Sequence, residues 1–254
     1  MAPAFRKNPF RDVGGQTGVA FAVKVGLIAD IHGNSPAFRS VLAALRGRVD
    51  CILFLGDLVG YYAFVNECAE EWETNQITAI LGNHDQILIE CLAQGKEPDE
   101  SYCVRYGSAL TRCLRQLSPQ ARSLIASWPQ HRSLTLEGVS VAMFHGAPWM
   151  PLEGRVYPDF AEWDRFDSCP EEVILLGHTH YPMVKKWRGK TIINPGSVGQ
   201  PRSRSGGAGA EFAVLDVAQR SAVLERVPYD VSRLVQDAQL HDPQMNYLVE
   251  VLRR

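Results

Sequence analysis

The sequence predicts an α/β fold, in which short buried strands alternate with amphipathic helices. Short runs rich in Val, Ile and Leu are each stopped by Gly or by a polar residue, a pattern typical of buried strands. Segments with apolar residues at helical spacing separate these runs in the first third of the chain. The length of 254 residues is enough for one large domain with a substantial core.

The first third of the chain alternates between the two patterns. A strand is expected at 23–29, and Ser35-Pro36 then marks a helix start, with Ser as the cap and Pro in the first turn. Apolar residues three and four positions apart give this helix one buried face, and Gly47 ends it. The next expected elements are a strand at 51–55, a helix near 64–73 and a strand at 77–81.

Residues 86–127 break this alternation with a long helical stretch, which we expect to be a helical cap inserted into the domain. Further strands are expected at 132–136, 139–144, 172–176, 183–187, 190–193, 211–217 and 222–228, followed by one or two terminal helices. We therefore expect a single domain over residues 23–254. Residues 1–22 lack the continuous apolar stretch of a secretion signal and predict a flexible N-terminal extension.

Composition excludes several classes of protein. The net charge of −2 gives no basic footprint for nucleic acid, so a nucleic-acid partner is disfavoured. No apolar run approaches the roughly 20 residues that a membrane-spanning helix needs, so we expect no membrane partner. The six cysteines form no C-x-x-C pair, which favours reduced structural thiols and a cytoplasmic location.

Metal-capable side chains follow five of the expected strands. They are Asp30 and His32, Asp57, Asn83, His145, and His178 with His180. Ligands in open α/β sheets bind beyond the carboxyl ends of the strands, so we expect these side chains to converge. Nitrogen and oxygen ligands without a thiolate suit two borderline divalent ions, with Mn²⁺ preferred and Fe²⁺, Zn²⁺, Ni²⁺ or Co²⁺ as alternatives. The set is too rich in His for Mg²⁺ alone or for Ca²⁺.

Each of these residues, taken alone, has an ordinary structural explanation. Gly followed by Asp after a strand usually forms a turn, and a lone His-Gly such as that at His145 is more often structural than metal-binding. Their joint occurrence favours a metal centre, because five of the seven histidines lie in these strand-end segments together with the Asp and Asn residues. The other two, His131 and His241, lie in polar surroundings and receive no role.

The five blocks Asp30-Ile31-His32, Gly56-Asp57, Gly82-Asn83-His84-Asp85, His145 and Gly177-His178-Thr179-His180 make the chain recognisable. It resembles the calcineurin-like metallophosphoesterase superfamily, whose pattern is D-x-H, G-D, G-N-H-[DE], H and G-H-x-H in this order. The segments 56–60 and 194–202 look like its bacterial and archaeal small-phosphodiesterase branch. The resemblance covers residues 23 to at least 228. It implies a four-layer α-β-β-α sandwich of two mixed β-sheets flanked by helices.

The resemblance also implies a role for each matching residue. Asp30, His32, Asp57 and His180 would hold one metal ion, and Asn83, His145 and His178 would join Asp57, as a bridge, on the second. His84 would face the substrate as a catalytic residue, stabilising the phosphoryl group or protonating the leaving oxygen, and Asp85 would orient its ring. The nucleophile implied by the family is a metal-bridging hydroxide, so no Ser or Cys nucleophile is required.

Departures from the superfamily pattern narrow the expected substrate. Eukaryotic-type Ser/Thr protein phosphatases continue the second block as G-D-x-V-D-R-G and place Arg before G-N-H-E. Here Gly60 is followed by Tyr61-Tyr62, and Leu81 precedes the third block, so both phosphate-gripping arginines of that branch are missing. Arg202 is a candidate phosphate contact because Arg binds phosphate oxygens bidentately, with a solvated loop charge as the alternative. Asn34, beside the metal loop, is a weaker candidate of the same kind.

The aromatic residues leave the substrate open. Tyr102, Tyr106 and Trp128 in or near the cap could stack on a nucleobase, although aromatics at helical spacing more often belong to a core. Trp149 and Tyr157, in the loop after His145, are better placed to line the site.

We therefore expect a dimetal phosphoesterase that hydrolyses a small phosphodiester, a phosphomonoester or a nucleotide phosphoanhydride. The alternatives are a dinucleoside polyphosphate hydrolase and a Ser/Thr-type protein phosphatase. A nuclease is disfavoured by the charge. A non-catalytic scaffold is disfavoured because His84 is present, and the sequence leaves the oligomeric state open.

Overall fold

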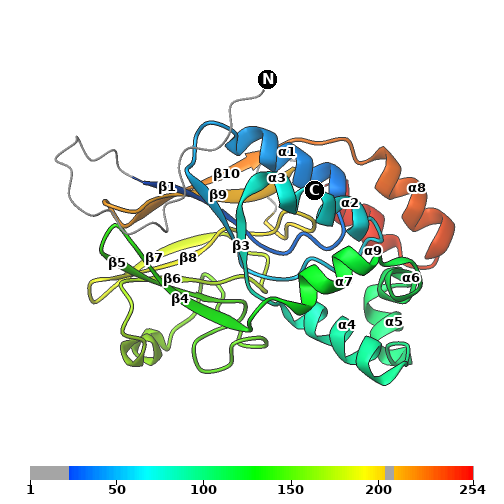
Figure 1. Ribbon diagram of the computed structural model, residues 1–254, viewed down its shortest axis with the longest axis horizontal. Coiled ribbons are helices and arrows are strands. Elements are labelled where there is room, and N and C mark those ends of the chain that lie inside the picture. Colours follow the sequence, from blue (N-terminus) through cyan, green and yellow to red (C-terminus); the bar gives the residue numbers. More distant parts are fainter. Residues whose placement is uncertain (1–22, 204–208, 254) are drawn as a thin grey trace.

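Two five-stranded β-sheets packed face to face form the centre of the molecule (Figure 1). The computed structural model describes residues 23–203 and 209–253, so the expected extension at 1–22 lies outside the described residues. Helices cover the outer side of the first sheet and gather at one end of both sheets. The expected α/β class, with two mixed sheets flanked by helices, is confirmed.

The first sheet has the strand order β10-β9-β1-β2-β3. Its strands are β1 (Lys24–Ile28), β2 (Cys51–Phe54), β3 (Ile77–Ala79), β9 (Ala210–Asp216) and β10 (Ser221–Val227). β1, β2 and β3 run parallel, and Gly26 pairs with Ile52 in the β1–β2 register. β9 returns antiparallel to β1, and β10 is antiparallel to β9.

The second sheet has the strand order β4-β5-β6-β8-β7. Its strands are β4 (His131–Leu136), β5 (Val139–Phe144), β6 (Val173–Leu175), β7 (Met183–Trp187) and β8 (Lys190–Asn194). β5, β6 and β8 are parallel, while β4 and β7 are antiparallel edge strands. Each sheet therefore contributes three parallel strands, whose carboxyl ends bound the candidate site.

Apolar side chains fill three layers of the sandwich. Alternate residues of both sheets, among them Leu27, Leu53 and Val141, are fully buried between the sheets. The outer face of the first sheet packs on the helices through residues such as Phe54 and Phe38. The outer face of the second sheet is covered by loop segments and by the short 3-10 helix η1 (Trp163–Ser168), so the fourth layer is thinner than the expected helical layer.

In chain order, the helices within the described residues are α1 (Ser35–Leu45), α2 (Val65–Glu70), α3 (Trp72–Asn75), α4 (Asn83–Gln94), α5 (Glu100–Tyr106), α6 (Ala109–Gln116), α7 (Pro119–Ala126), α8 (Ser232–His241) and α9 (Asn246–Glu250), with the 3-10 turn η2 (Val251–Arg253) at the end. Asn34 rather than Ser35 caps α1, since its side chain accepts the N–H of Ala37.

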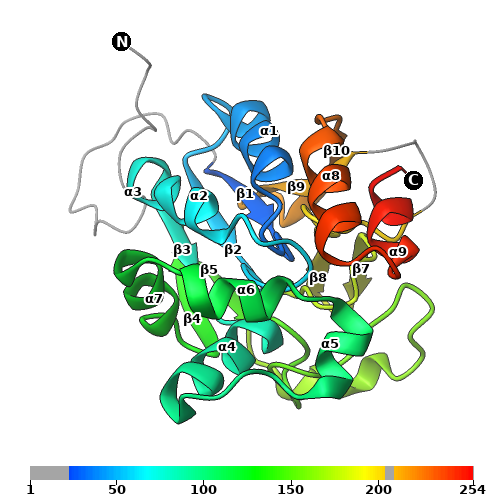
Figure 2. The same ribbon diagram turned by 90° about the vertical axis from the view of Figure 1, so that its right-hand side faces the viewer.

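Helices α4 to α7 fill the segment between β3 and β4 and stand beside α8 and α9 at one end of the sheets (Figures 1 and 2). α4 begins at Asn83, three residues before the expected start of the helical stretch, because the polar block is itself the first helical turn. Gly82 is the N-cap of this helix, and Gly95 ends it in a left-handed conformation. The third motif block therefore lies on a helix N-terminus.

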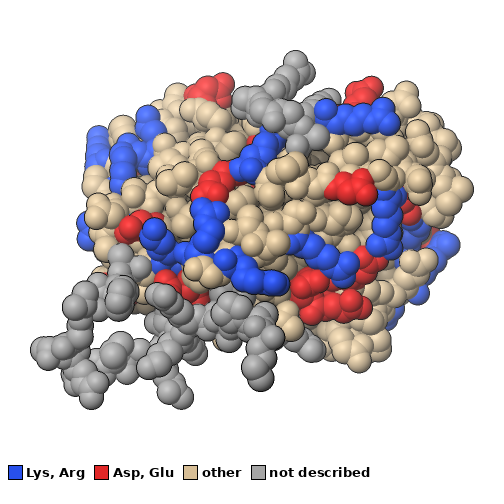
Figure 3. All heavy atoms as spheres, turned by 90° about the horizontal axis from the view of Figure 1, so that it is seen from above, with Lys and Arg blue, Asp and Glu red and all other residues tan. Residues whose placement is uncertain are grey.

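Among the described residues, no helix is both long and apolar enough to cross a membrane. On the face that Figure 3 shows, basic and acidic side chains are interspersed over the surface.

Candidate metal centre

The candidate ligands lie beyond the carboxyl ends of the parallel strands of both sheets. Asp30 and His32 follow β1, Asp57 follows β2, and Asn83 opens the helix after β3. His145 follows β5, and His178 and His180 follow β6. The two sheets thus bring together all seven residues that the strand-end pattern predicts.

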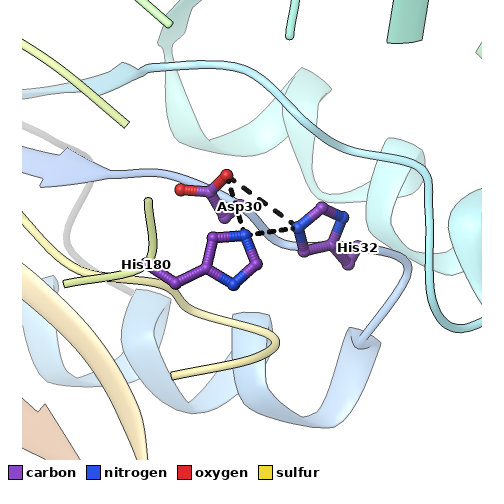
Figure 4. Close-up of side chains that lie close together, drawn as sticks. All are labelled: Asp30, His32 and His180. Carbon is purple, nitrogen blue, oxygen red and sulfur yellow. Dashed lines mark hydrogen bonds and ion pairs between the residues drawn. The ribbon is translucent and has the colours of Figure 1, made fainter. Parts of the chain in front are cut away.

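Asp30, His32 and His180 form the first cluster (Figure 4). The Nε2 atoms of the two imidazoles are 3.0 Å apart. Asp30 Oδ1 lies 3.4 Å from His180 Nε2 and 3.8 Å from His32 Nε2. All three side chains are buried, at 0 to 3 % exposure.

The hydrogen bonds of the first cluster identify the ring nitrogens that are free to bind a cation. His32 Nδ1 donates to the Val59 carbonyl at 2.8 Å, and His180 Nδ1 donates to the Gln200 carbonyl at 2.8 Å. A carbonyl only accepts, so the proton of each neutral ring lies on Nδ1 and the lone pair lies on Nε2. Two lone pairs that face each other beside a carboxylate repel unless a cation lies between them.

The Asp30 carboxylate independently indicates a cation-binding position. Both of its carboxylate oxygens are buried, and neither has a hydrogen-bond partner among the described residues. A buried ionised carboxylate without donors is costly, whereas the same carboxylate on a metal ion is satisfied. The first cluster therefore fits one divalent cation on two imidazole nitrogens and a carboxylate oxygen.

Asn83, His145 and His178 form the second cluster. Asn83 Oδ1 lies 3.0 Å from His145 Nε2 and 3.0 Å from His178 Nδ1. His145 Nδ1 donates to the Leu55 carbonyl at 2.7 Å, which directs Nε2 into the cluster. An amide oxygen and two imidazole nitrogens are suitable donors for a borderline divalent ion.

Asp57 lies between the two clusters. Its Oδ2 is 3.2 Å from His145 Nε2 and 3.9 Å from His32 Nε2. Its Oδ1 accepts the backbone N–H of His84 at 2.8 Å, at the N-terminus of α4, where the helix dipole favours a negative charge. Asp57 is thus the carboxylate that can contact cations on both sides.

Charge and burial shift the pKa values in this centre in opposite directions. Burial keeps the pKa of His32 well below its usual value, and burial with the neighbouring His145 lowers that of His178 to about 2. Burial also opposes protonation of His145, but the nearby Asp57 carboxylate raises its pKa to about 10. Positive charge between Asp57 and Asn83 is therefore favoured, whether a proton or a metal ion provides it.

The backbone around the centre is unusual. Five candidate ligands have a left-handed conformation, with φ between 51° and 66°: Asp30, His32, Asp57, His178 and His180. Residues other than Gly seldom adopt it, and such strain concentrates at functional sites. Two glycines leave room for the ligand side chains. A Cβ at Gly60 would lie 2.4 Å from His32 Nδ1, and a Cβ at Gly82 would lie 2.1 Å from Asp57 Oδ1.

The expected pairing of Asp85 with the ring of His84 is corrected by the structure. The Asp85 carboxylate instead accepts the backbone N–H groups of Gly82, Asp57, Leu58 and Val59, at 2.9 to 3.1 Å. It therefore fixes the β2 loop on the first turn of α4. His84 Nδ1 is hydrogen-bonded to the hydroxyl of Tyr102 on α5 at 2.5 Å. A sequence motif cannot reveal this partner, because it lies 18 residues away in the helical segment.

Asn34 also has a different position from the one expected. Its oxygen caps α1, and its amide donates to the Gly199 carbonyl and the Tyr229 hydroxyl, both at 3.0 Å. The side chain is fully buried. Its hydrogen-bonding groups are used by the fold, so it is not available as a substrate contact.

A cavity of about 270 Å³ opens beside the centre and is lined by Asp57, Asn83, His84, His178 and His180. Arg202 and Tyr157 reach it as the sequence predicts, and Tyr106 joins them. Trp149 instead packs on Phe160 and Phe166, and Trp128 packs in the core. The residues at the cavity that the sequence analysis did not identify are Tyr61, Arg105, Arg155 and Tyr247. Only Tyr61 carried a signal, its place directly after the second block.

Comparisons with known proteins agree with this geometry. The family model of the calcineurin-like phosphoesterase superfamily domain matches residues 23–220, so the chain belongs to this superfamily. An uncharacterized protein of Methanocaldococcus jannaschii is 30 % identical over 227 residues, covering 82 % of this chain and 89 % of that protein. The resemblance inferred from the motif blocks is confirmed.

Two solved structures share the whole fold. A metallophosphoesterase from Sphaerobacter thermophilus has a TM-score of 0.70 at 27 % identity, covering 91 % of this chain and 98 % of that chain. A hypothetical protein from Pyrococcus horikoshii has a TM-score of 0.74 at 21 % identity, with the same coverage of 91 % and 98 %. The fold is thus shared by a bacterial and an archaeal protein.

Proposed function

We propose that this protein is a phosphoesterase that hydrolyses small phosphate esters with two divalent metal ions. The observation that carries the proposal is the first cluster, in which two imidazole lone pairs 3.0 Å apart face a buried carboxylate that has no donor. Asp30, His32 and His180 with Asp57 would hold one ion, and Asn83, His145 and His178 with Asp57 the other. Mn²⁺ is the preferred ion, because imidazoles favour borderline ions over hard ones.

When bound, two such ions supply an activated water and neutralise charge on the phosphoryl oxygens. The chain's own residues bind and orient the ester. The cavity beside Asp57 admits a small substrate, and Arg202 at its edge offers a guanidinium for a phosphoryl oxygen.

His84 is proposed to give a proton from Nε2 to the leaving oxygen as the phosphorus–oxygen bond breaks. Its ring is buried at the cavity, and the hydroxyl of Tyr102 holds Nδ1. This hydrogen bond directs Nε2 away from Tyr102 and fixes the ring plane, a role that a carboxylate often has beside a catalytic His.

The substrate is proposed to be a phosphodiester, a phosphomonoester or a nucleotide phosphoanhydride, with dinucleoside polyphosphates as the alternative. A Ser/Thr-type protein phosphatase is disfavoured, because Tyr61 and Leu81 stand near the positions where that branch has arginines. The six cysteines are free, which supports the cytoplasm as the proposed location.

A substrate screen over a panel of divalent ions tests this proposal. p-Nitrophenyl phosphate, its bis-ester and dinucleoside polyphosphates would be offered to protein loaded with Mn²⁺, Fe²⁺, Zn²⁺, Ni²⁺, Co²⁺ or Ca²⁺. We expect hydrolysis that chelation abolishes and that Mn²⁺ restores better than Ca²⁺. Activity that survives exhaustive chelation would exclude the metal-dependent function, as would the absence of hydrolysis with every ion.

A further inference from the structure

Three arginines from distant parts of the chain line the cavity beside the metal centre. Arg105 lies on α5, Arg155 lies in the loop between β5 and η1, and Arg202 follows β8. Apart from the metal ligand Asp57, no carboxylate is among the residues that line this cavity. The arginines therefore face a region of positive charge.

Within the part of the chain that the structure describes, these arginines differ from most others because they have no acidic partner. Elsewhere guanidinium groups pair with carboxylates, as Arg112 does with Asp237 at 2.7 Å. Within residues 23–203 and 209–253, no carboxylate oxygen lies within 4.0 Å of the guanidinium nitrogens of Arg105, Arg155 or Arg202.

Their contacts are with neutral groups. Arg155 Nε donates to His178 Nε2 at 3.3 Å, and Arg202 Nη2 donates to the Tyr61 hydroxyl at 3.4 Å. The Arg105 guanidinium lies 5.8 Å from the centre of the Tyr106 ring. Such contacts position a guanidinium without neutralising it, so each arginine can still bind an anion.

One phosphoryl group carries too little negative charge to balance the positive groups around this cavity. Two divalent ions would carry four positive charges, against three negative ones on Asp30, Asp57 and a bridging hydroxide, so a phosphomonoester dianion would balance the centre with one negative charge to spare. Two of the three positive charges of the arginines around the same cavity would then remain without counter-charge. A substrate with further phosphoryl groups would provide the missing negative charge.

We infer that Arg105, Arg155 and Arg202 form an anion subsite for a second phosphoryl group of the substrate, which would make phosphoanhydrides such as nucleoside di- and triphosphates the preferred class. The inference rests on the proposed function, since it concerns the substrate of the same centre. The subsite binds and orients the substrate and takes no part in bond breaking.

Calorimetry on the full chain, freed of divalent ions, tests the subsite without relying on catalysis. The probes are inorganic tripolyphosphate and orthophosphate. We expect wild-type protein to bind tripolyphosphate at least about tenfold more tightly than orthophosphate, because the longer anion can accept additional charge-assisted hydrogen bonds from the arginines. Equal affinity for the two anions would overturn the inference.

Substitutions test whether the three arginine side chains cause the preference for tripolyphosphate. Arg105→Gln, Arg155→Gln and Arg202→Gln should each lower the affinity for tripolyphosphate about five- to tenfold and that for orthophosphate less than about twofold. Arg115→Gln is the matched control, because Arg115 pairs with Glu97 on an exposed surface and should change neither affinity. Equal losses for both anions would show that the arginines bind a single phosphoryl group instead.

A second set of variants separates a lost contact from a folding defect. An activity assay separates failure of the subsite from failure of the proposed function. Arg→Lys at each position retains the charge and should recover part of the affinity for tripolyphosphate, which a folding defect would not allow. If the metal-loaded protein hydrolyses no phosphate ester while the preference for tripolyphosphate holds, the proposed function is wrong and the subsite stands. If it hydrolyses esters without that preference, the subsite is wrong and the proposed function stands.

Discussion

The two ligand clusters differ in how firmly their imidazoles are held. In the first cluster both rings are fixed by Nδ1 hydrogen bonds to backbone carbonyls, and Nε2 already faces the binding position. In the second cluster His145 is fixed in the same way, but His178 has a side chain, Arg155, as its partner. The first cluster is thus organised by the backbone and the second partly by the side chain of an exposed residue.

The position of the proton on His178 adds to this difference between the two clusters. Arg155 donates to Nε2, so a neutral His178 ring carries its proton on Nδ1, the nitrogen that faces Asn83. To bind a cation through Nδ1, the proton would have to move to Nε2 and Arg155 would have to turn away. The first cluster requires no such change, and we therefore expect it to bind its metal ion more tightly.

The largest expected effect comes from the residue that both clusters share. Asp57→Asn removes the carboxylate charge that lies 3.2 Å from His145 and 3.9 Å from His32. We expect metal analysis of this variant to show loss of metal at both sites. The affinity should fall by more than the roughly 10–100-fold that residues hydrogen-bonded to metal ligands contribute. If one ion remains at full occupancy, the bridging role of Asp57 is wrong.

Metal titration of cluster variants tests the predicted order of binding. In wild-type protein we expect two classes of Mn²⁺ site that differ at least about tenfold in affinity. His178→Ala should remove the weaker class, while His180→Ala should remove the tighter one. Two classes of equal affinity, or loss of the tighter class in His178→Ala, would contradict the comparison of the clusters.

His84 lies beside His32 and Asp57 and is expected to act on turnover alone. His84→Ala should lower kcat by about 10²–10⁴-fold with unchanged metal content. kcat/KM should fall with kcat, as for a contact made in the transition state. The loss should be smaller for a p-nitrophenyl ester than for an alkyl ester, because p-nitrophenolate needs no proton to leave. Equal losses would remove the general-acid role and leave His84 as a phosphate-stabilising group.

The smallest effect is expected at Tyr102. Tyr102→Phe removes one hydrogen bond to His84 and should lower kcat about three- to tenfold, with KM and metal content unchanged. A double-mutant cycle gives the specific readout, because the change should have no further effect in the His84→Ala background. An additive loss would mean that Tyr102 acts by stabilising the helical segment and not by positioning His84.

The strands and the ligands were predictable for the same physical reason. All ten strands appear near their expected positions, because buried strands require apolar runs and the loops after them begin with polar residues or glycine. The candidate ligands follow these strands, so local sequence was enough to place Asp30, Asp57 and His178 at strand ends. The order of the parallel strands then brings the ligands together.

The partners of these residues were not predictable from local pattern. The sequence suggests an active-site role for Asp85, in the third block, and for Asn34, beside the metal loop. The Asp85 side chain instead accepts backbone N–H groups, and that of Asn34 bonds backbone groups and the Tyr229 hydroxyl. Tyr102 and Arg155 reach the site from segments whose sequence spacing encodes no metal or phosphate pattern. Such contacts depend on tertiary packing. The spacing of apolar residues, two for a strand and 3.6 for a helix, does not describe it.

The left-handed residues of the centre have a consequence for the evolution of this fold. A left-handed conformation costs an L-amino acid about 1 kcal/mol or more that glycine does not lose. Five such positions coincide with candidate ligands, so the chain has residues there that cost stability where glycine would not. In a lineage released from catalysis, these positions should drift first, towards glycine or asparagine. Thermal unfolding of His178→Gly, without added metal, should accordingly show a higher Tm than that of His178→Ala.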